Sequence, residues 1–74
     1  MTLDQVDIGG KAVITAVHLE GAERRRIFDL GLSIGTIVEA VRRSPLGDPV
    51  AYRVRGSTIA LRKEQASRIE VEIG

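Results

Sequence analysis

The chain of 74 residues contains no cysteine and only one histidine, His18. Without cysteine there is no disulfide, no thiol nucleophile and no zinc site built on thiolates. His18 is near Glu20 and Glu23 in the sequence, and a cluster of imidazole and carboxylate groups could hold zinc or iron. A single histidine with acids at no fixed ligand spacing is more typical of a surface residue at the end of a strand. We therefore expect neither a metal site nor a bound cofactor.

Aromatic residues are almost as scarce, because Phe28 and Tyr52 are the whole set. Proteins that bind single-stranded nucleic acid stack bases on several aromatic rings, and domains that bind proline-rich peptides line a groove with them. The composition therefore argues against both kinds of binding module.

A large excess of one charge is also missing, since 11 Lys and Arg stand against 10 Asp and Glu, for a formal net charge of +1. This balance gives no overall field that would attract nucleic acid, so such a role would need arginines gathered on one surface. One predicted hairpin carries arginines that could form this surface, namely Arg42, Arg43, Arg53 and Arg55. A regulatory domain that contacts protein or nucleic acid is the alternative hypothesis, with nucleic acid the less favoured partner.

Long hydrophobic runs are absent as well. The longest uncharged apolar run, residues 30–38, contains two glycines and falls short of the roughly 18 residues that a membrane span needs. The N-terminal segment carries acids where a signal peptide would carry lysines. We expect a soluble cytoplasmic protein that reaches a membrane only through a partner.

The sequence also contains no recognisable set of catalytic residues. The length fits one domain, residues 1–74, and a domain this small has no room for a substrate cleft. No Ser-His-Asp set and no thiol are available for nucleophilic or acid-base chemistry. We therefore expect a protein that is not an enzyme.

What the sequence does contain is a series of short strand patterns. Segments rich in β-branched or alternating apolar residues predict five strands, at residues 11–19, 36–43, 50–55, 58–62 and 68–73. The segment at residues 22–30 (AERRRIFDL) predicts the only helix longer than one turn, and residues 63–66 predict a single helical turn. This order fits a mainly β fold, a small closed or nearly closed antiparallel barrel with one short helix inserted after the first strand. A mixed open sheet with a covering helix is the alternative.

Glycines and prolines mark the turns between these elements. The LGLSIG stretch at residues 30–35 follows a helix and lacks GK[ST], so it is not a phosphate loop; Gly31 is expected to end the helix. The SPLGDP stretch has the residues of a tight turn rather than of a ligand loop. The predicted structural turn residues are Gly35, Pro45, Gly47, Asp48, Pro49 and Gly56.

The predicted helix carries three consecutive arginines, Arg24, Arg25 and Arg26, beside Glu23 and Asp29. At 100° per residue these arginines spread over about 200° of the helix surface and form no narrow basic stripe. A solvated face or a partner contact is therefore favoured over nucleic acid. On the same helix, Phe28 is either a core residue or a partly exposed anchor for a partner.

Several short motifs in this order resemble the FeoA family. The motifs are RIFDLGL at residues 26–32, SIGT at 33–36, PLGDP at 45–49, VRG at 54–56, IALR at 59–62 and EQA at 64–66. The family's usual pattern is RLxxLGLxPGxxV, a PLGDP hairpin, a short glycine turn and IALRxxEA. Ile27 stands where the family often has Leu, Ile34 stands where it often has Pro, and Gln65 shifts the acid of the last motif by one place.

The resemblance implies an SH3-like five-stranded antiparallel barrel. It also implies a small cytosolic accessory protein of bacterial ferrous iron uptake, which works with the FeoB permease and its GTP-binding domain. A similar SH3-like domain forms the C-terminal part of iron-dependent repressors. No helix-turn-helix precedes the barrel here, so we expect a free-standing FeoA-like domain.

A partner surface is expected on the helix and its exit, because arginine and aromatic residues are the types most enriched at binding hot spots. The predicted partner-binding residues are Arg25, Arg26, Phe28, Asp29, Leu30, Gly31 and Leu32. Association of two copies through the same helix, a homo-oligomer, is the other contact that this surface could make.

Overall fold

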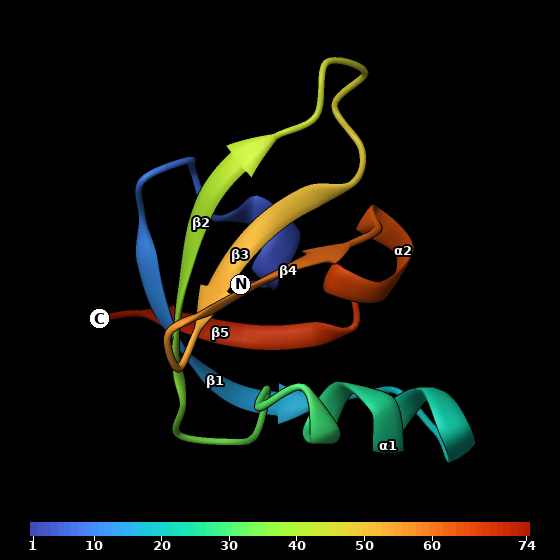
Figure 1. Ribbon diagram of the computed structural model, residues 1–74. Coiled ribbons are helices and arrows are strands. Elements are labelled where there is room, and N and C mark those ends of the chain that lie inside the picture. Colours follow the sequence, from blue (N-terminus) through green and yellow to red (C-terminus); the bar gives the residue numbers. More distant parts are fainter.

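Five strand segments form one antiparallel sheet in the computed structural model, which describes residues 1–74. The strands are β1 (Lys11–Val17), β2 (Ile37–Arg43), β3 (Val50–Val54), β4 (Ser57–Leu61) and β5 (Ile69–Ile73). Their order across the sheet is β4-β3-β2-β1-β5, so β4 and β5 form its two edges (Figure 1).

The sheet bends strongly on itself. The register shifts between Ile14 and Ala16 where β1 pairs with β5, and between Ala40 and Arg42 where β2 pairs with β3. An extra residue in one strand of a pair bends that strand and increases its twist. As a result β5 crosses beneath β2 and β3 rather than running alongside them (Figure 1).

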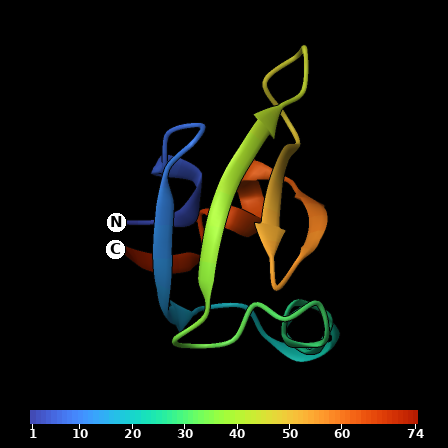
Figure 2. The same ribbon diagram turned by 60° about the vertical axis from the view of Figure 1, so that its left-hand side comes forward.

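The N-terminal residues cover the β5 edge. Thr2 forms an isolated antiparallel bridge with Glu70, and the Val71 N–H donates to the Met1 carbonyl oxygen over 2.8 Å. A 3-10 turn, η1 (Leu3–Gln5), follows and buries Leu3 completely. Figure 2 shows both termini on this side of the sheet.

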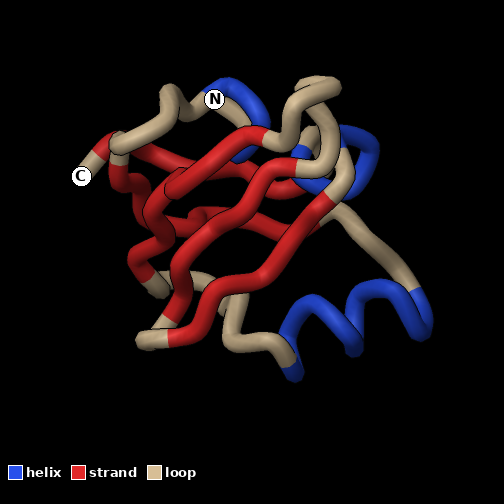
Figure 3. Tube along the Cα trace, turned by 45° about the horizontal axis from the view of Figure 1, so that its top comes forward, coloured by secondary structure: helices blue, strands red, loops and turns tan.

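Two α-helices lie outside the sheet. The helix α1 (Gly21–Asp29) connects β1 to β2, and the single turn α2 (Lys63–Ala66) connects β4 to β5. Both lie at the periphery of the strands, and α1 stands farther from them than α2 does (Figure 3).

Apolar residues on the inner side of the bent sheet build one core. In β3, Tyr52 and Val54 are buried, while Arg53 between them is exposed, as the alternation predicts. Fifteen apolar residues form the cluster: Leu3, Val6, Ala12, Ile14, Leu19, Ile27, Leu32, Val38, Ala40, Tyr52, Val54, Leu61, Ala66, Ile69 and Val71.

The predicted architecture of five antiparallel strands, with one helix after the first, is confirmed. The strand ends differ at the hairpin between β3 and β4. The predicted strands end at Arg55 and begin at Thr58, whereas β3 ends at Val54 and β4 begins at Ser57. Arg55 and Gly56 form the two-residue turn, with φ of 50° and 83°. Positive φ at both positions defines the type I′ turn that fits the twist of a hairpin.

Candidate partner-binding surface

The C-terminal end of α1 is closed by its own backbone. The Gly31 N–H donates to the Phe28 carbonyl over 2.9 Å, and the Leu32 N–H donates to the Ile27 carbonyl over 3.1 Å. Gly31 has φ +97°, the left-handed value that this capping pattern needs. The turn brings Leu32 back beside Ile27, and both side chains are fully buried.

Most of α1 projects from the domain. Residues 20–26 are exposed without exception, and Ile27 is the only fully buried residue of the helix. Leu30 at its end is half-buried and packs against the core. Figure 1 shows the N-terminal end of α1 extending past the sheet. The helix is thus held to the barrel mainly at its C-terminal end.

The side chains on this projecting helix carry charge that no ion pair neutralises. The structure contains three ion pairs, and none of them involves Arg24, Arg25, Arg26 or Asp29. Arg24 instead lies over the Phe28 ring, with its guanidinium carbon 4.7 Å from the ring centroid. A guanidinium over an aromatic face is attracted by the ring quadrupole.

Phe28 is half-buried and does not belong to the group of residues that pack on the core. Of the two interpretations left open by the sequence, the structure favours the partly exposed aromatic residue. Covered on one side by Arg24, the ring still presents apolar surface beside the arginines.

The structure brings several of the predicted partner-binding residues together. A shallow hollow along α1 is lined by Arg25, Arg26, Asp29 and Leu30, together with Gly21 and Ala22. A second hollow on the adjoining side of the helix includes Arg24 and Phe28. We call the set formed by the exposed Arg25, Arg26 and Asp29 and the half-buried Phe28 and Leu30 the α1 surface.

Leu32 was wrongly assigned to this surface. Its side chain is 0% exposed and packs in the core, because the capping turn after Leu30 reverses the chain toward the sheet. Gly31 offers no side chain and is half-buried against Val54 and Arg55. A partner can therefore touch the helix, but it cannot reach Leu32.

The predicted turn residues lie in three loops. Gly35 closes the turn before β2, and Gly56 completes the turn between β3 and β4. Pro45 lies in the loop between β2 and β3, where the Gly47 N–H donates to the Ser44 carbonyl over 2.8 Å. The peptide bond between Asp48 and Pro49 in the same loop is cis.

Asp48 has a contact that sequence reasoning missed. Its Oδ1 accepts a hydrogen bond of 2.8 Å from the Lys63 N–H, at the first residue of α2. Its other oxygen lies 3.9 Å from Nη1 of Arg62. Free N–H groups at a helix start favour a carboxylate, but the separation of 15 positions along the chain hid this contact from any local pattern.

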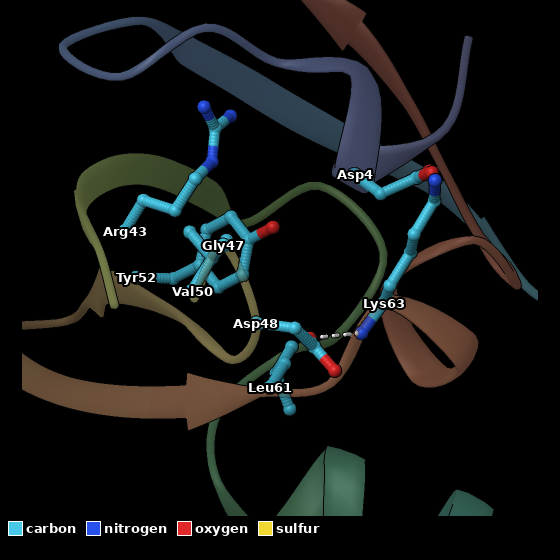
Figure 4. A pocket seen from close by; sticks show the side chains of 8 residues that line it. All are labelled: Asp4, Arg43, Gly47, Asp48, Val50, Tyr52, Leu61 and Lys63. Atoms are coloured by element: carbon cyan, nitrogen blue, oxygen red, sulfur yellow. Dashed lines mark hydrogen bonds between the residues drawn. The ribbon is translucent and has the colours of Figure 1, made fainter. Parts of the chain in front are cut away.

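The loop that holds Asp48 also lines a partly open pocket of about 250 Å³ (Figure 4). Its lining residues are Asp4, Arg43, Gly47, Asp48, Val50, Tyr52, Leu61 and Lys63. Burial and the nearby carboxylate of Asp4 raise the pKa of Tyr52 to about 12. The phenol therefore stays neutral at physiological pH.

His18 pairs with Glu70 rather than with Glu20 or Glu23. The hydrogen bond and the charge of His18 hold the pKa of the Glu70 carboxyl below its usual range. No group of three or more His, Cys, Asp or Glu side chains is arranged to hold a metal ion.

The arginines of the nucleic-acid hypothesis are spread over the hairpin. Arg42 and Arg43 lie at the end of β2, opposite Ala51 and Val50. Arg53 forms an ion pair of 3.4 Å with Glu39, and Arg55 donates to Thr36 Oγ1 over 3.3 Å at the far end of the hairpin. These positions do not form a single basic patch. Separately, none of the helices is long and apolar enough to cross a membrane.

A bent five-stranded antiparallel sheet with a helix between its first two strands defines a small SH3-like domain. Comparison with known protein families identifies the family of this domain, because the family model for the FeoA domain matches residues 1–73. The chain belongs to the FeoA domain family, as its motifs indicated.

Individual relatives agree with this assignment. The chain is 40% identical over 73 residues to an Fe(2+) transport protein A/Fe(2+) transporter FeoB fusion protein of Porphyromonas gingivalis, covering 99% of this chain and 9% of that protein. It matches the solution structure of iron(II) transport protein A from Clostridium thermocellum with a TM-score of 0.94 and 33% identity, covering 99% of this chain and 45% of the other.

The crystal structure of Stenotrophomonas maltophilia FeoA complexed with zinc, a protein described as a prokaryotic SH3 domain protein, matches with a TM-score of 0.83 and 32% identity. That match covers 97% of this chain and 89% of the other. A manganese-dependent transcriptional repressor shares the fold with a TM-score of 0.86 at 15% identity, covering 99% of this chain and 41% of the other, which confirms the expected likeness to a repressor domain in fold alone.

Proposed function

We propose that this domain is a non-catalytic accessory protein of ferrous iron transport, which acts in the cytoplasm by binding the GTP-binding domain of a FeoB-type permease. The relative from Porphyromonas gingivalis joins transport protein A and FeoB in one chain. The Stenotrophomonas maltophilia protein has been proposed as a bacterial ferrous iron transport activating factor. The fusion protein supports a role beside the permease, and the second relative supports a role in ferrous iron transport.

The observation that carries the proposal is the α1 surface. A short helix that projects from a rigid barrel, with three arginines lacking carboxylate partners and a half-buried Phe28, exposes the side chains that dominate binding hot spots. Because Ile27 and the capping turn fix the C-terminal end of the helix, little backbone conformational entropy is lost there when a partner binds.

A partner that touches this surface in one nucleotide state more closely than in another would have its equilibrium shifted by the difference in affinity. Regulation of the permease therefore needs no catalytic group in this domain. It needs only different contacts to two states of the partner.

The test is a calorimetric titration of the GTP-binding domain of a FeoB-type permease with this protein, in the presence of GDP and of a non-hydrolysable GTP analogue. Phe28→Ala and Arg25→Glu should each weaken binding by about tenfold or more. Arg42→Glu, the same charge reversal on β2, is the matched control and should leave the affinity unchanged.

Binding that neither α1 substitution weakens would remove the α1 surface from the proposal. Absence of binding in both nucleotide states would refute the permease as partner. Equal affinity in the two states would refute regulation by population shift.

A further inference from the structure

The strand β4 leaves one edge of the sheet uncovered. At the opposite edge, residues 1–2 pair with the middle of β5. Beyond β4 the sheet has no further strand, and Figure 2 shows it at the margin of the sheet. An uncovered edge strand is a template on which another extended chain can pair.

The backbone groups that point out of this edge belong to Thr58 and Ala60. In an antiparallel ladder every second residue directs its N–H and C=O away from the neighbouring strand. The two-residue turn pairs Ser57 with Val54, which sets residues 57, 59 and 61 toward β3 and residues 58 and 60 outward. None of the hydrogen bonds outside the regular elements uses a backbone group of Thr58 or Ala60.

Nothing in β4 blocks such pairing. Natural edge strands are usually protected by a charge, a proline or a bulge. The five residues of β4 (STIAL) are uncharged and contain no proline, and their register with β3 runs without a shift. The side chains of these two residues, Thr58 and Ala60, are small and exposed.

Positive charge stands at both ends of this edge. Arg55 precedes β4, and Arg62 and Lys63 follow it, while residues 49–63 contain no Asp or Glu. Arg55 and Lys63 have no carboxylate partner, although the Arg55 guanidinium donates to Thr36 Oγ1 over 3.3 Å, and Arg62 only approaches Asp48 at 3.9 Å. A chain paired along β4 would meet cations at each of its ends.

These charges disfavour a second copy of this chain. If two β4 strands paired antiparallel through Thr58 and Ala60, Lys63 of one copy would lie opposite Arg55 of the other. Like charges placed opposite one another across a strand pair are destabilising. A segment with carboxylates seven or eight positions apart, the spacing from Arg55 to Arg62 and Lys63, would instead be matched at both ends.

We propose that the free edge of β4 accepts an extended acidic segment of a partner protein as a sixth strand. Thr58 and Ala60 supply the backbone hydrogen bonds, and the cations at the two ends of β4 favour a segment with negative charge. This surface is separate from the α1 surface, and the inference does not require that the partner be the permease.

The first experiment uses the peptide DEVTVTVED as probe and KKVTVTVKK as its matched control. On titration of isotope-labelled protein, the acidic peptide should shift the amide resonances of Thr58 and Ala60 in a saturable manner and slow their hydrogen exchange. The lysine peptide should do neither. Saturable binding of both peptides alike, or of neither, overturns the proposal.

The second experiment uses variants that alter the edge without altering the core. Thr58→Pro removes an outward N–H but no bond to β3, and it should weaken binding of the acidic peptide by about tenfold or more. Thr58→Val keeps the N–H and should bind as the wild type does. If Thr58→Pro does not fold, the wild-type amide data together with the charge variant below decide the question.

The double substitution Arg62→Gln and Lys63→Gln should weaken binding by about threefold at low salt, whereas Lys11→Gln, on β1 across the sheet, should have no effect. Phe28→Ala should also have none, which separates this surface from the α1 surface. Two results contradict the proposal. One is a concentration-dependent dimer that Thr58→Pro abolishes, and the other is duplex DNA that shifts the same amides while the acidic peptide does not.

Discussion

Gly31 and Val54 approach so closely that a side chain at position 31 would be crowded against Val54. A Cβ built on Gly31 would lie 3.3 Å from Cγ1 of Val54 and 3.3 Å from Cδ of Arg55. The same residue has φ +97°, which a residue with a Cβ adopts only with strain. Gly31 thus ends α1 and lets the backbone that follows the helix pack closely against the end of β3.

Substitution of Gly31 by alanine tests this double constraint, and Gly35 provides a matched control. Gly35 has φ +89°, but a Cβ there would meet nothing within 4 Å. Gly35→Ala should cost about 1 kcal/mol of the free energy of unfolding through the backbone alone. Gly31→Ala should cost about 2 to 3 kcal/mol, because overpacking adds to the backbone strain. Urea unfolding measures both, and equal losses would contradict the close approach.

The same region shows what the sequence could and could not predict. A glycine after an apolar-periodic segment correctly predicted a left-handed Gly31 just beyond the helix, although the predicted helix at residues 22–30 lies one residue later than α1 at both ends. The helical periodicity does not extend past that cap, so it could not show that Leu32 returns to the core. The contact between Asp48 and α2 was equally hidden, because two segments distant in sequence meet there only after the barrel forms.

Arg55 shows a different reason why a prediction from the sequence was wrong. Alternation predicted it as the last residue of a strand, whereas it occupies the first position of the turn with φ 50°. Asn, Asp or Gly is the residue that usually marks this position, so arginine gives no turn signal. Its side chain instead donates to Thr36 Oγ1, a contact formed across the fold.

Replacement of Arg55 by asparagine should therefore raise the stability of the domain. Asparagine adopts positive φ at lower cost, and this gain should exceed the loss of one long hydrogen bond by about 0.5 kcal/mol. Arg55→Gln loses the same guanidinium but keeps the strained backbone, so it should be less stable than the wild type. Thermal unfolding of the three proteins checks this order, and an asparagine variant no more stable than the glutamine variant would contradict it.

Tyr52 should ionise only in strongly alkaline solution. Its pKa is raised to about 12 from an ordinary value of 10.0, mainly by burial and then by the charge of Asp4. Because the folded pKa is the higher one, the stability linked to this phenol is fully present below pH 10 and is lost as the pH rises toward 12. Tyr52 is the only tyrosine and there is no tryptophan, so ultraviolet absorbance follows this single group.

Asp4→Asn is the control for that titration. Removing the carboxylate should lower the pKa of Tyr52 while leaving the burial of its ring in place. An absorbance midpoint near 10 in the folded wild-type protein would show that the phenol is solvated rather than enclosed.

The pKa of Glu70 is shifted downward, in contrast to that of Tyr52, and the cause is His18. The hydrogen bond from His18, and then its charge, lower the pKa of the Glu70 carboxyl from 4.5. A lowered folded pKa means that the linked stability is present above the ordinary carboxyl value and is lost as the pH falls through the lowered one. The effect on stability should be small, because both side chains are about half exposed and water screens the pair.

The pKa itself gives the sharper measurement. Carbon NMR of the side-chain carboxyl groups should show Glu70 titrating at lower pH than in His18→Gln, where its pKa should return toward the ordinary value. If Glu70 titrates identically in both proteins, the pair with His18 does not persist in solution and the link between the end of β1 and β5 rests on the backbone ladder alone.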